Sequence, residues 1–181
     1  MSGARSYTTY KISIITLFSV LLAVSSFLNK FTYQTSQIIS AIIYTTGIIL
    51  ASSPGSALMI ALIAGGIYMF QSLLGFFALI AFALRGIYTE AFFILLKVYQ
   101  GHVTVIRVSA AMMISSLLTG LSFYILFIHI LKILPDWGLI PLLIITCIAV
   151  ISNGIGSYVA VKYVIPLIKK IAFRGEFYGT P

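Results

Sequence analysis

The sequence has few charged residues, and acidic ones are the rarest. Of its 181 residues three are Asp or Glu and 11 are Lys or Arg, and all charged residues together make up 8% of the chain. A soluble domain carries about a quarter charged residues, so this chain lacks the polar surface that water requires. The shortage of acids also leaves an enzyme without a nucleophile and base or an acid–base pair. We therefore expect no enzyme and no catalytic residue.

Cysteine and histidine are equally scarce. The single cysteine, Cys147, lies within an apolar run, which excludes intramolecular disulfides, multi-cysteine metal sites and Cys-x-x-Cys redox chemistry. The two histidines, His102 and His129, lie in different segments and have no metal-ligand spacing to each other or to an acid. No HExxH, GxSxG or P-loop motif is present. We expect neither a metal nor a cofactor.

Apolar residues dominate instead, at 61% of the chain. A helix that spans a bilayer needs about 20 predominantly apolar residues. Only helices and closed barrels satisfy their backbone in lipid, and the runs here are continuous rather than alternating. Turn and charge signals divide the chain into six runs, at residues 12–28, 38–51, 56–71, 79–99, 103–134 and 139–171. The sequence thus predicts an all-α, polytopic membrane protein, with residues 1–181 forming one transmembrane domain of six helices.

Two segments leave alternatives open. The first apolar run follows a basic N-terminus, as in a cleavable signal peptide, but it is long for the core of one, so we expect a retained helix. Residues 56–99 contain no charge before Arg85 and are too long for one span, so we divide them into two helices. The connection at residues 72–77 is compatible with a turn or with a short re-entrant or lid segment.

The formal charge of +8 comes from basic residues between or at the ends of apolar runs. That placement is typical of topology control and of contact with anionic lipid headgroups, and it disfavours nucleic-acid binding. If both termini are cytoplasmic, eight basic residues lie on the cytoplasmic side of the cell membrane and three on its outer side. This distribution agrees with the positive-inside rule. The outer three are Lys30, Lys132 and Arg85, and we expect Arg85 to reach the interface from the outer end of its helix.

Glu90 is the strongest candidate for a solute-binding residue. It lies in the apolar stretch FALRGIYTEAFFILLK, residues 82–97. A charge at the bilayer centre costs about 2.5–3.5 kcal/mol, so its carboxylate should face a cavity or a partner. Gly86 lies one helical turn before it on the same stripe, whereas Arg85 is about 140° round the helix. The alternatives are a hydrogen bond to a polar solute and a pairing with Arg or Lys of a neighbouring helix; we favour the solute.

Other polar and aromatic residues extend the candidate site. Tyr68 and Gln71 are three residues apart and share a helical face, so they could line a pocket at the outer leaflet. Tyr44, in the short second run, is a similar but weaker candidate. The alternative for these tyrosines is an aromatic belt at the membrane interface.

Small residues mark helix faces that allow close packing. Thr16, Ser19 and Ala23 lie on one face of the first run, where another helix can approach closely. That helix belongs either to the same bundle or to a partner. In SNGIGS, residues 152–157, we expect the glycines to pack closely and Asn153 to form a hydrogen bond across helices.

The stretch SSPGSALMIALIAGGIYMFQSLLGFFALIAFALRGIYTEAFFILLKVY, residues 52–99, resembles the core of the substrate-binding S component of energy-coupling-factor (ECF) vitamin transporters. It is most similar to the hydroxymethylpyrimidine/thiamine type, in which a Pro-Gly-x-Ala-Leu turn opens helix three and a Gly-x-x-x-Glu lies in helix four. These motifs match residues 54–58 and the pair Gly86 and Glu90. The stretch ISNGIGSYVAVKYVIPLIKK, residues 151–170, resembles the glycine-rich last helix of S components.

The resemblance implies a substrate-binding subunit that captures a vitamin or precursor, a thiamine- or hydroxymethylpyrimidine-like heterocycle, from outside. The implied partners are a membrane coupling protein and two cytoplasmic ATPase subunits. Glu90 would form a hydrogen bond with a ring amine of the substrate, and Gly86 would lie on the same helical face as Glu90. Tyr68 and Tyr44 would close over the ring, and Gln71 would lie beside these tyrosines. The family's Ala-x-x-x-Ala coupling motif falls on Ser19 and Ala23, next to Thr16, so Ser replaces its first Ala. The alternative function is a non-transporting structural subunit of a membrane complex.

Overall fold

The computed structural model describes residues 2–32, 36–72, 75–100, 103–132 and 139–177, and these are helical apart from short connections. The α-helices are α1 (Ser2–Thr32), α2 (Ser36–Ala51), α3 (Ser56–Met69), α4 (Phe76–Leu95), α5 (Val105–Tyr124), α6 (Leu139–Val159) and α7 (Ile165–Phe177). A π-helical segment, Ile125–Ile130, continues α5, and another, Ala160–Val164, joins α6 to α7. The described residues contain no strand, and the all-α prediction is confirmed.

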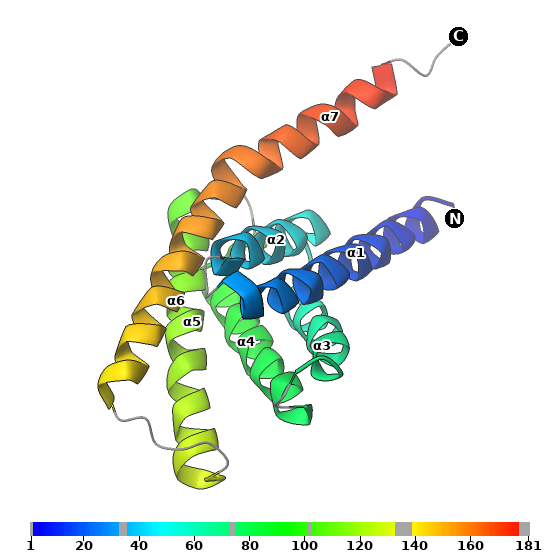
Figure 1. Cartoon of the computed structure of the whole chain (residues 1–181). Helices are drawn as coiled ribbons and strands as arrows, with labels where there is room; N and C mark the ends of the chain where they lie inside the picture. The colour runs from blue at the N-terminus through cyan, green and yellow to red at the C-terminus, as the bar shows by residue number, and fades with distance from the viewer. Residues whose placement is uncertain (1, 33–35, 73–74, 101–102, 133–138, 178–181) are drawn as a thin grey trace.

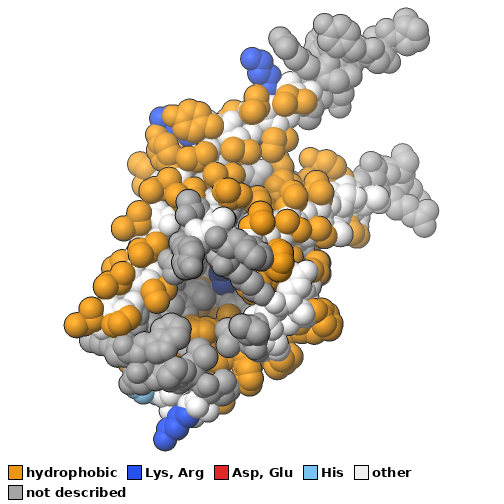
Figure 2. Space-filling view, in the orientation of Figure 1, with side chains coloured by type: hydrophobic (Ala, Val, Ile, Leu, Met, Phe, Trp, Pro, Cys, Tyr) orange, Lys and Arg blue, Asp and Glu red, His pale blue; other side chains and the backbone are white. Residues whose placement is uncertain are grey.

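Four helical segments are long and apolar enough to cross a membrane: Thr8–Leu28, Phe76–Leu95, Val105–Ile130 and Leu143–Ile171. The helices α2 and α3 are apolar but shorter. At 1.5 Å per residue, the 14 residues of α3 cover about 21 Å of a hydrocarbon core that is about 30 Å thick. Figure 2 shows hydrophobic side chains spread over the visible face of the bundle, as lipid contact requires. The chain is a multi-pass membrane protein.

The helix boundaries differ from the predicted runs at several points. Helix α1 extends to Thr32, through part of the polar stretch that follows the first apolar run. Helix α4 begins at Phe76 and ends at Leu95, earlier at both ends than the predicted run 79–99. Of the predicted lid segment 72–77, residues 73–74 lie outside the described residues, Gly75 donates its backbone N–H to the carbonyl of Ser72 (3.0 Å), and Phe76 already opens α4. Part of that segment is therefore helix.

Helices α1 to α6 form a ring that follows the chain order except that α1 lies between α2 and α3. Helix α1 packs against α2 and α3, α3 against α4, α4 against α5, α5 against α6, and α6 against α2, which closes the ring (Figure 1). Helix α7 continues α6 away from the bundle, and its far end and the beginning of α1 extend toward the same side. The cytoplasmic location of both termini stays a prediction.

Hydroxyl pairs connect neighbouring helices of the ring. Such bonds between transmembrane helices contribute about 0.6–2 kcal/mol each. The pairs are Ser25 with Ser40 (2.9 Å, α1–α2), Thr89 with Ser115 (3.2 Å, α4–α5), Tyr88 with Ser122 (2.7 Å, α4–α5) and Ser157 with Ser109 (3.3 Å, α6–α5). Each pair satisfies a polar group that lipid would leave without a partner.

Glycines set the closest approach between helices. A Cβ atom at Gly156 would lie 2.5 Å from the Cβ of Ala41 and 2.7 Å from the carbonyl oxygen of Ile38, so α6 touches the backbone of α2. The predicted close packing of residues 152–157 is confirmed at this position. Its neighbour Gly154 faces the side chain of Met113 on α5 in the same way, at 2.9 Å.

Gly156→Ala should lower the unfolding temperature of the purified protein. The added methyl group must displace α2 backbone, and overpacking of this kind costs about 1–3 kcal/mol. The matched control is Gly66→Ala in α3, where a Cβ atom would meet nothing within 4 Å. That variant should keep or raise the unfolding temperature, because Ala exceeds Gly in helix propensity by about 1 kcal/mol. Circular dichroism during heating measures both, and equal effects would contradict the α2–α6 contact.

Candidate functional site

The first turn of α3 is held by a carboxylate from another helix. The backbone N–H groups at the start of a helix have no partner within it. Here the N–H of Gly55 donates to Oε1 of Glu90 (2.7 Å), and the N–H of Ala57 donates to Oε2 (3.0 Å). The positive end of the helix dipole adds to this attraction. Glu90, five residues before the end of α4, therefore caps α3.

A tyrosine completes the bonding of this carboxylate. The hydroxyl of Tyr99 donates to Oε2 of Glu90 (3.0 Å). Tyr99 lies in the turn after α4, where Lys97 adopts a positive φ of 54° and the chain reverses direction. Burial raises the pKa of Tyr99 above its ordinary value, so the phenol keeps its proton at neutral pH and remains a donor. Glu90 thus accepts three hydrogen bonds from the protein.

Two other predicted site residues lie at the same end of α3. Tyr44 is fully buried and donates its hydroxyl to the carbonyl of Ala57 (2.9 Å). A Cβ atom at Gly86 would lie 2.9 Å from the Cβ of Ala61 and 3.1 Å from the Cα of Leu58, so α4 approaches α3 closely there. The approach lets Glu90, one turn further along α4, reach the α3 backbone. The Pro-Gly-x-Ala-Leu and Gly-x-x-x-Glu stretches are the two sides of one contact.

Tyr68 and Gln71 lie at the opposite end of α3. Ala57 and Tyr68 are separated by about 16 Å along the helix axis. The Tyr68 ring packs against Phe82 of α4, with 5.7 Å between ring centroids, and Gln71 is exposed. The five predicted site residues therefore form two groups rather than one cluster. Substrate contact by any of them stays a prediction.

Arg85 was expected at the membrane interface, and that prediction is wrong. The residue lies midway along the 20-residue helix α4, because the helix begins at Phe76. Its side chain points inward: the Nη2 atom donates to Oδ1 of Asn153 on α6 (2.7 Å), and the guanidinium carbon lies 5.0 Å from the centre of the Tyr44 ring on α2. Helix α4 packs chiefly on α3 and α5, so this side chain reaches across the ring of helices.

Asn153 joins this inward arginine to two further helices. Its Nδ2 atom donates to the hydroxyl of Ser116 on α5 (3.1 Å) and to the carbonyl of Ala149 in its own helix (2.8 Å). The predicted hydrogen bond of Asn153 across helices is confirmed. Arg85, Asn153, Ser116 and Tyr44 form a group that we call the interior polar network, with contributions from α2, α4, α5 and α6. Sequence reasoning recognised Asn153 but not its partner Arg85.

The three residues predicted to form a coupling face do not share one surface. Ser19 is 0% and Ala23 2% exposed, whereas Thr16 is exposed. Helix α1 packs on α2 and α3, and Ser19 donates its hydroxyl to the carbonyl of Ile15 (2.6 Å). The two small residues thus serve packing within the bundle. A coupling role for Thr16, Ser19 and Ala23 stays a prediction, and it requires α1 to move.

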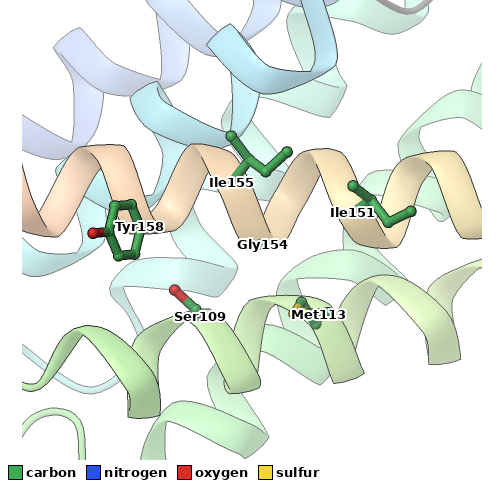
Figure 3. Close-up of a pocket in the computed structure, with 6 residues that line it drawn as sticks. All are labelled: Ser109, Met113, Ile151, Gly154, Ile155 and Tyr158. Carbon is green, nitrogen blue, oxygen red and sulfur yellow. The ribbon is translucent and has the colours of Figure 1, made fainter.

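A surface groove runs between α5 and α6 (Figure 3). Its volume is about 450 Å³, and its lining is Ser109, Met113, Ile151, Gly154, Ile155 and Tyr158. None of these residues is charged, and none belongs to the predicted site. The groove therefore offers no ionic partner to a polar solute. Within the described part of the chain no group of three or more His, Cys, Asp or Glu residues could hold a metal ion.

One solved structure with the same arrangement of helices is described as the "Crystal structure of an S-component of ECF transporter". The alignment covers 94% of this chain and 98% of that chain, with a TM-score of 0.57 and 20% sequence identity. The chain therefore has the fold of that S component. No family model matches the sequence, and no curated protein matches it.

Glu90→Gln should destabilise the protein in the absence of any solute. A neutral amide loses the attraction to the helix dipole and turns one donor group toward backbone N–H or phenol donors, which costs about 1–3 kcal/mol. Tyr99→Phe removes a single donor from the same carboxylate and should cost less. Thermal unfolding of the purified variants measures both effects. An unchanged unfolding temperature for Glu90→Gln would mean that the carboxylate does not hold α3.

Proposed function

We propose that this chain is the substrate-binding subunit of an ECF-type importer. It captures a vitamin-like heterocycle, of the thiamine or hydroxymethylpyrimidine kind, from outside the cell. The observation that carries the proposal is the interior polar network, which lies within a fold shared with an S component over 94% of the chain. Charged and amide side chains are rare inside a membrane bundle and by default mark a site where a solute binds or passes.

The network lies at the depth that such a site requires. Arg85 is about 14 Å along α4 from its first residue, near the middle of a hydrocarbon core of about 30 Å. In the predicted orientation α4 runs from outside to inside, so a solute that enters from outside meets Arg85 and Asn153 at the floor of its path. Tyr68 and Gln71 lie at the outer end of α3 in that orientation, where a solute first arrives.

Glu90 takes a positioning role in this proposal. Its carboxylate already accepts hydrogen bonds from Gly55, Ala57 and Tyr99. A solute amine would have to replace one of these donors and release the first turn of α3. Glu90 and Gly86 therefore set the place of α3 and of Ala57, whose carbonyl in turn fixes the hydroxyl of Tyr44.

The energy for transport has to come from other subunits. The chain contains no P-loop, so it does not itself bind ATP by that motif. We propose as partners a membrane coupling protein and two cytoplasmic ATPase subunits. The basic residues Lys169 and Lys170 of α7 are exposed, as expected for the cytoplasmic side.

Solute binding should raise the unfolding temperature of the purified protein. A ligand at 100 times its Kd stabilises the folded state by about 2.7 kcal/mol. The measurement is thermal unfolding in detergent with thiamine, hydroxymethylpyrimidine and a panel of other vitamins, each compared with the protein alone. Gly66→Ala should respond as the unchanged protein does. If no compound shifts the unfolding temperature, the chain is not a vitamin-binding subunit, and a structural role in a membrane complex replaces the proposal.

A further inference from the structure

Arg85 is a cation most of whose donors have no partner among the described residues. A guanidinium carries five N–H donors. The structure gives it one hydrogen bond, to Asn153, and one aromatic face, that of Tyr44. Among the described residues no acidic side chain forms an ion pair with it. Glu90, an acid on the same helix, is bonded to the start of α3 instead.

Six other basic side chains avoid this situation by exposure. Those of Lys97, Arg107, Lys132, Lys162, Lys169 and Lys170 are exposed, whereas Arg85 is half-buried at mid-helix. An unpaired charge at that depth is costly, and such a group usually faces a counter-ion, a ligand or a water-filled cavity. Figure 2 shows basic side-chain atoms at the floor of a hollow in the visible face of the bundle. The guanidinium of Arg85 lies between Asn153 of α6 and the Tyr44 ring of α2, within the ring of helices.

The residues around Arg85 would accept an anion. Asn153, Ser116 and Tyr44 are all neutral, so none of them repels a carboxylate or phosphate. A second group is also left without a partner: the Oε1 atom of Gln37 is buried and accepts no hydrogen bond from the described residues. Gln37 and Tyr44 are seven residues apart on α2 and so share a face, separated by about 10 Å along the axis. Among the described residues, Gln37 Oε1 therefore lacks a hydrogen-bond donor, and most N–H groups of Arg85 lack an acceptor.

We propose that Arg85 binds the anionic group of the transported solute, a carboxylate or phosphate oxygen, and that Gln37 accepts a hydrogen bond from an N–H or O–H at its other end. This inference rests on the proposed function and adds the charge of the solute to it. Guanidinium binds carboxylate and phosphate through two parallel N–H donors, a geometry that Lys cannot reproduce. Among thiamine-like compounds, phosphate esters fit the site better than the bare thiazolium cation.

Binding of matched compounds that differ in one anionic group tests the inference. The pairs are hydroxymethylpyrimidine and its phosphate, thiamine and thiamine monophosphate, nicotinamide and nicotinate, and panthenol and pantothenate. In at least one pair the anionic member should bind about tenfold tighter or more, as a charge-assisted bond provides. Arg85→Gln should remove that preference, and Arg85→Lys should restore only part of it. Arg107→Gln, which removes an exposed charge at the start of α5, should leave it unchanged.

The outcomes separate the two proposals. If, in every pair that binds, the member without the anionic group binds as tightly as its partner, and Arg85→Gln changes neither affinity, Arg85 is structural and the inference is overturned while the proposed function stands. If no member of any pair binds, the proposed function fails, and the inference fails with it. Circular dichroism and the unfolding temperature report whether Arg85→Gln folds. Where it does not fold, the pairs measured on the unchanged protein decide, because an anion preference below about tenfold contradicts the inference.

Discussion

The capping of α3 by Glu90 is the contact on which the rest of the structure depends. Helix α3 is short and begins directly after Pro54 and Gly55, and a helix end in a bilayer has no water to satisfy its backbone N–H groups. The carboxylate oxygens accept hydrogen bonds from the N–H groups of Gly55 and Ala57. Because Gly86 has no side chain, α4 can approach α3 closely at that position. With α3 fixed on α4, the carbonyl of Ala57 holds Tyr44, and α2 joins the same contact. The contact between α6 and α2 then completes the ring of helices.

This arrangement decides how charge is distributed inside the bundle. Glu90 and Arg85 are five residues apart on α4, yet they point about 140° apart round the helix and bind different neighbours. Glu90 serves α3, whereas Arg85 reaches α2 and α6. The acid accepts hydrogen bonds from two backbone N–H groups and a phenol, whereas Arg85 forms one side-chain hydrogen bond among the described residues. Under the proposal that Arg85 binds solute, an anionic group is what complements this cation.

Composition and periodicity were sufficient for the fold class, for the apolar runs and for the close packing around Gly156. They could not identify the partner of Glu90, because backbone N–H groups 33 and 35 residues away carry no side-chain signal. Arg85 was misplaced because the face that a helix turns inward depends on neighbours that the sequence does not specify, and because α4 begins earlier than predicted. The small residues of α1 were compatible with packing inside the bundle or against a partner, and only the structure shows that Ser19 and Ala23 are buried, whereas Thr16 is exposed.

The most direct test of this account is an experimental structure of the protein with its solute bound. The account predicts an anionic oxygen of the solute at about 3 Å from the Arg85 guanidinium, near Asn153. The same structure should retain the bonds from Gly55 and Ala57 to Glu90. A solute bound to Glu90, with the first turn of α3 released and Arg85 still bonded to Asn153 alone, would contradict it.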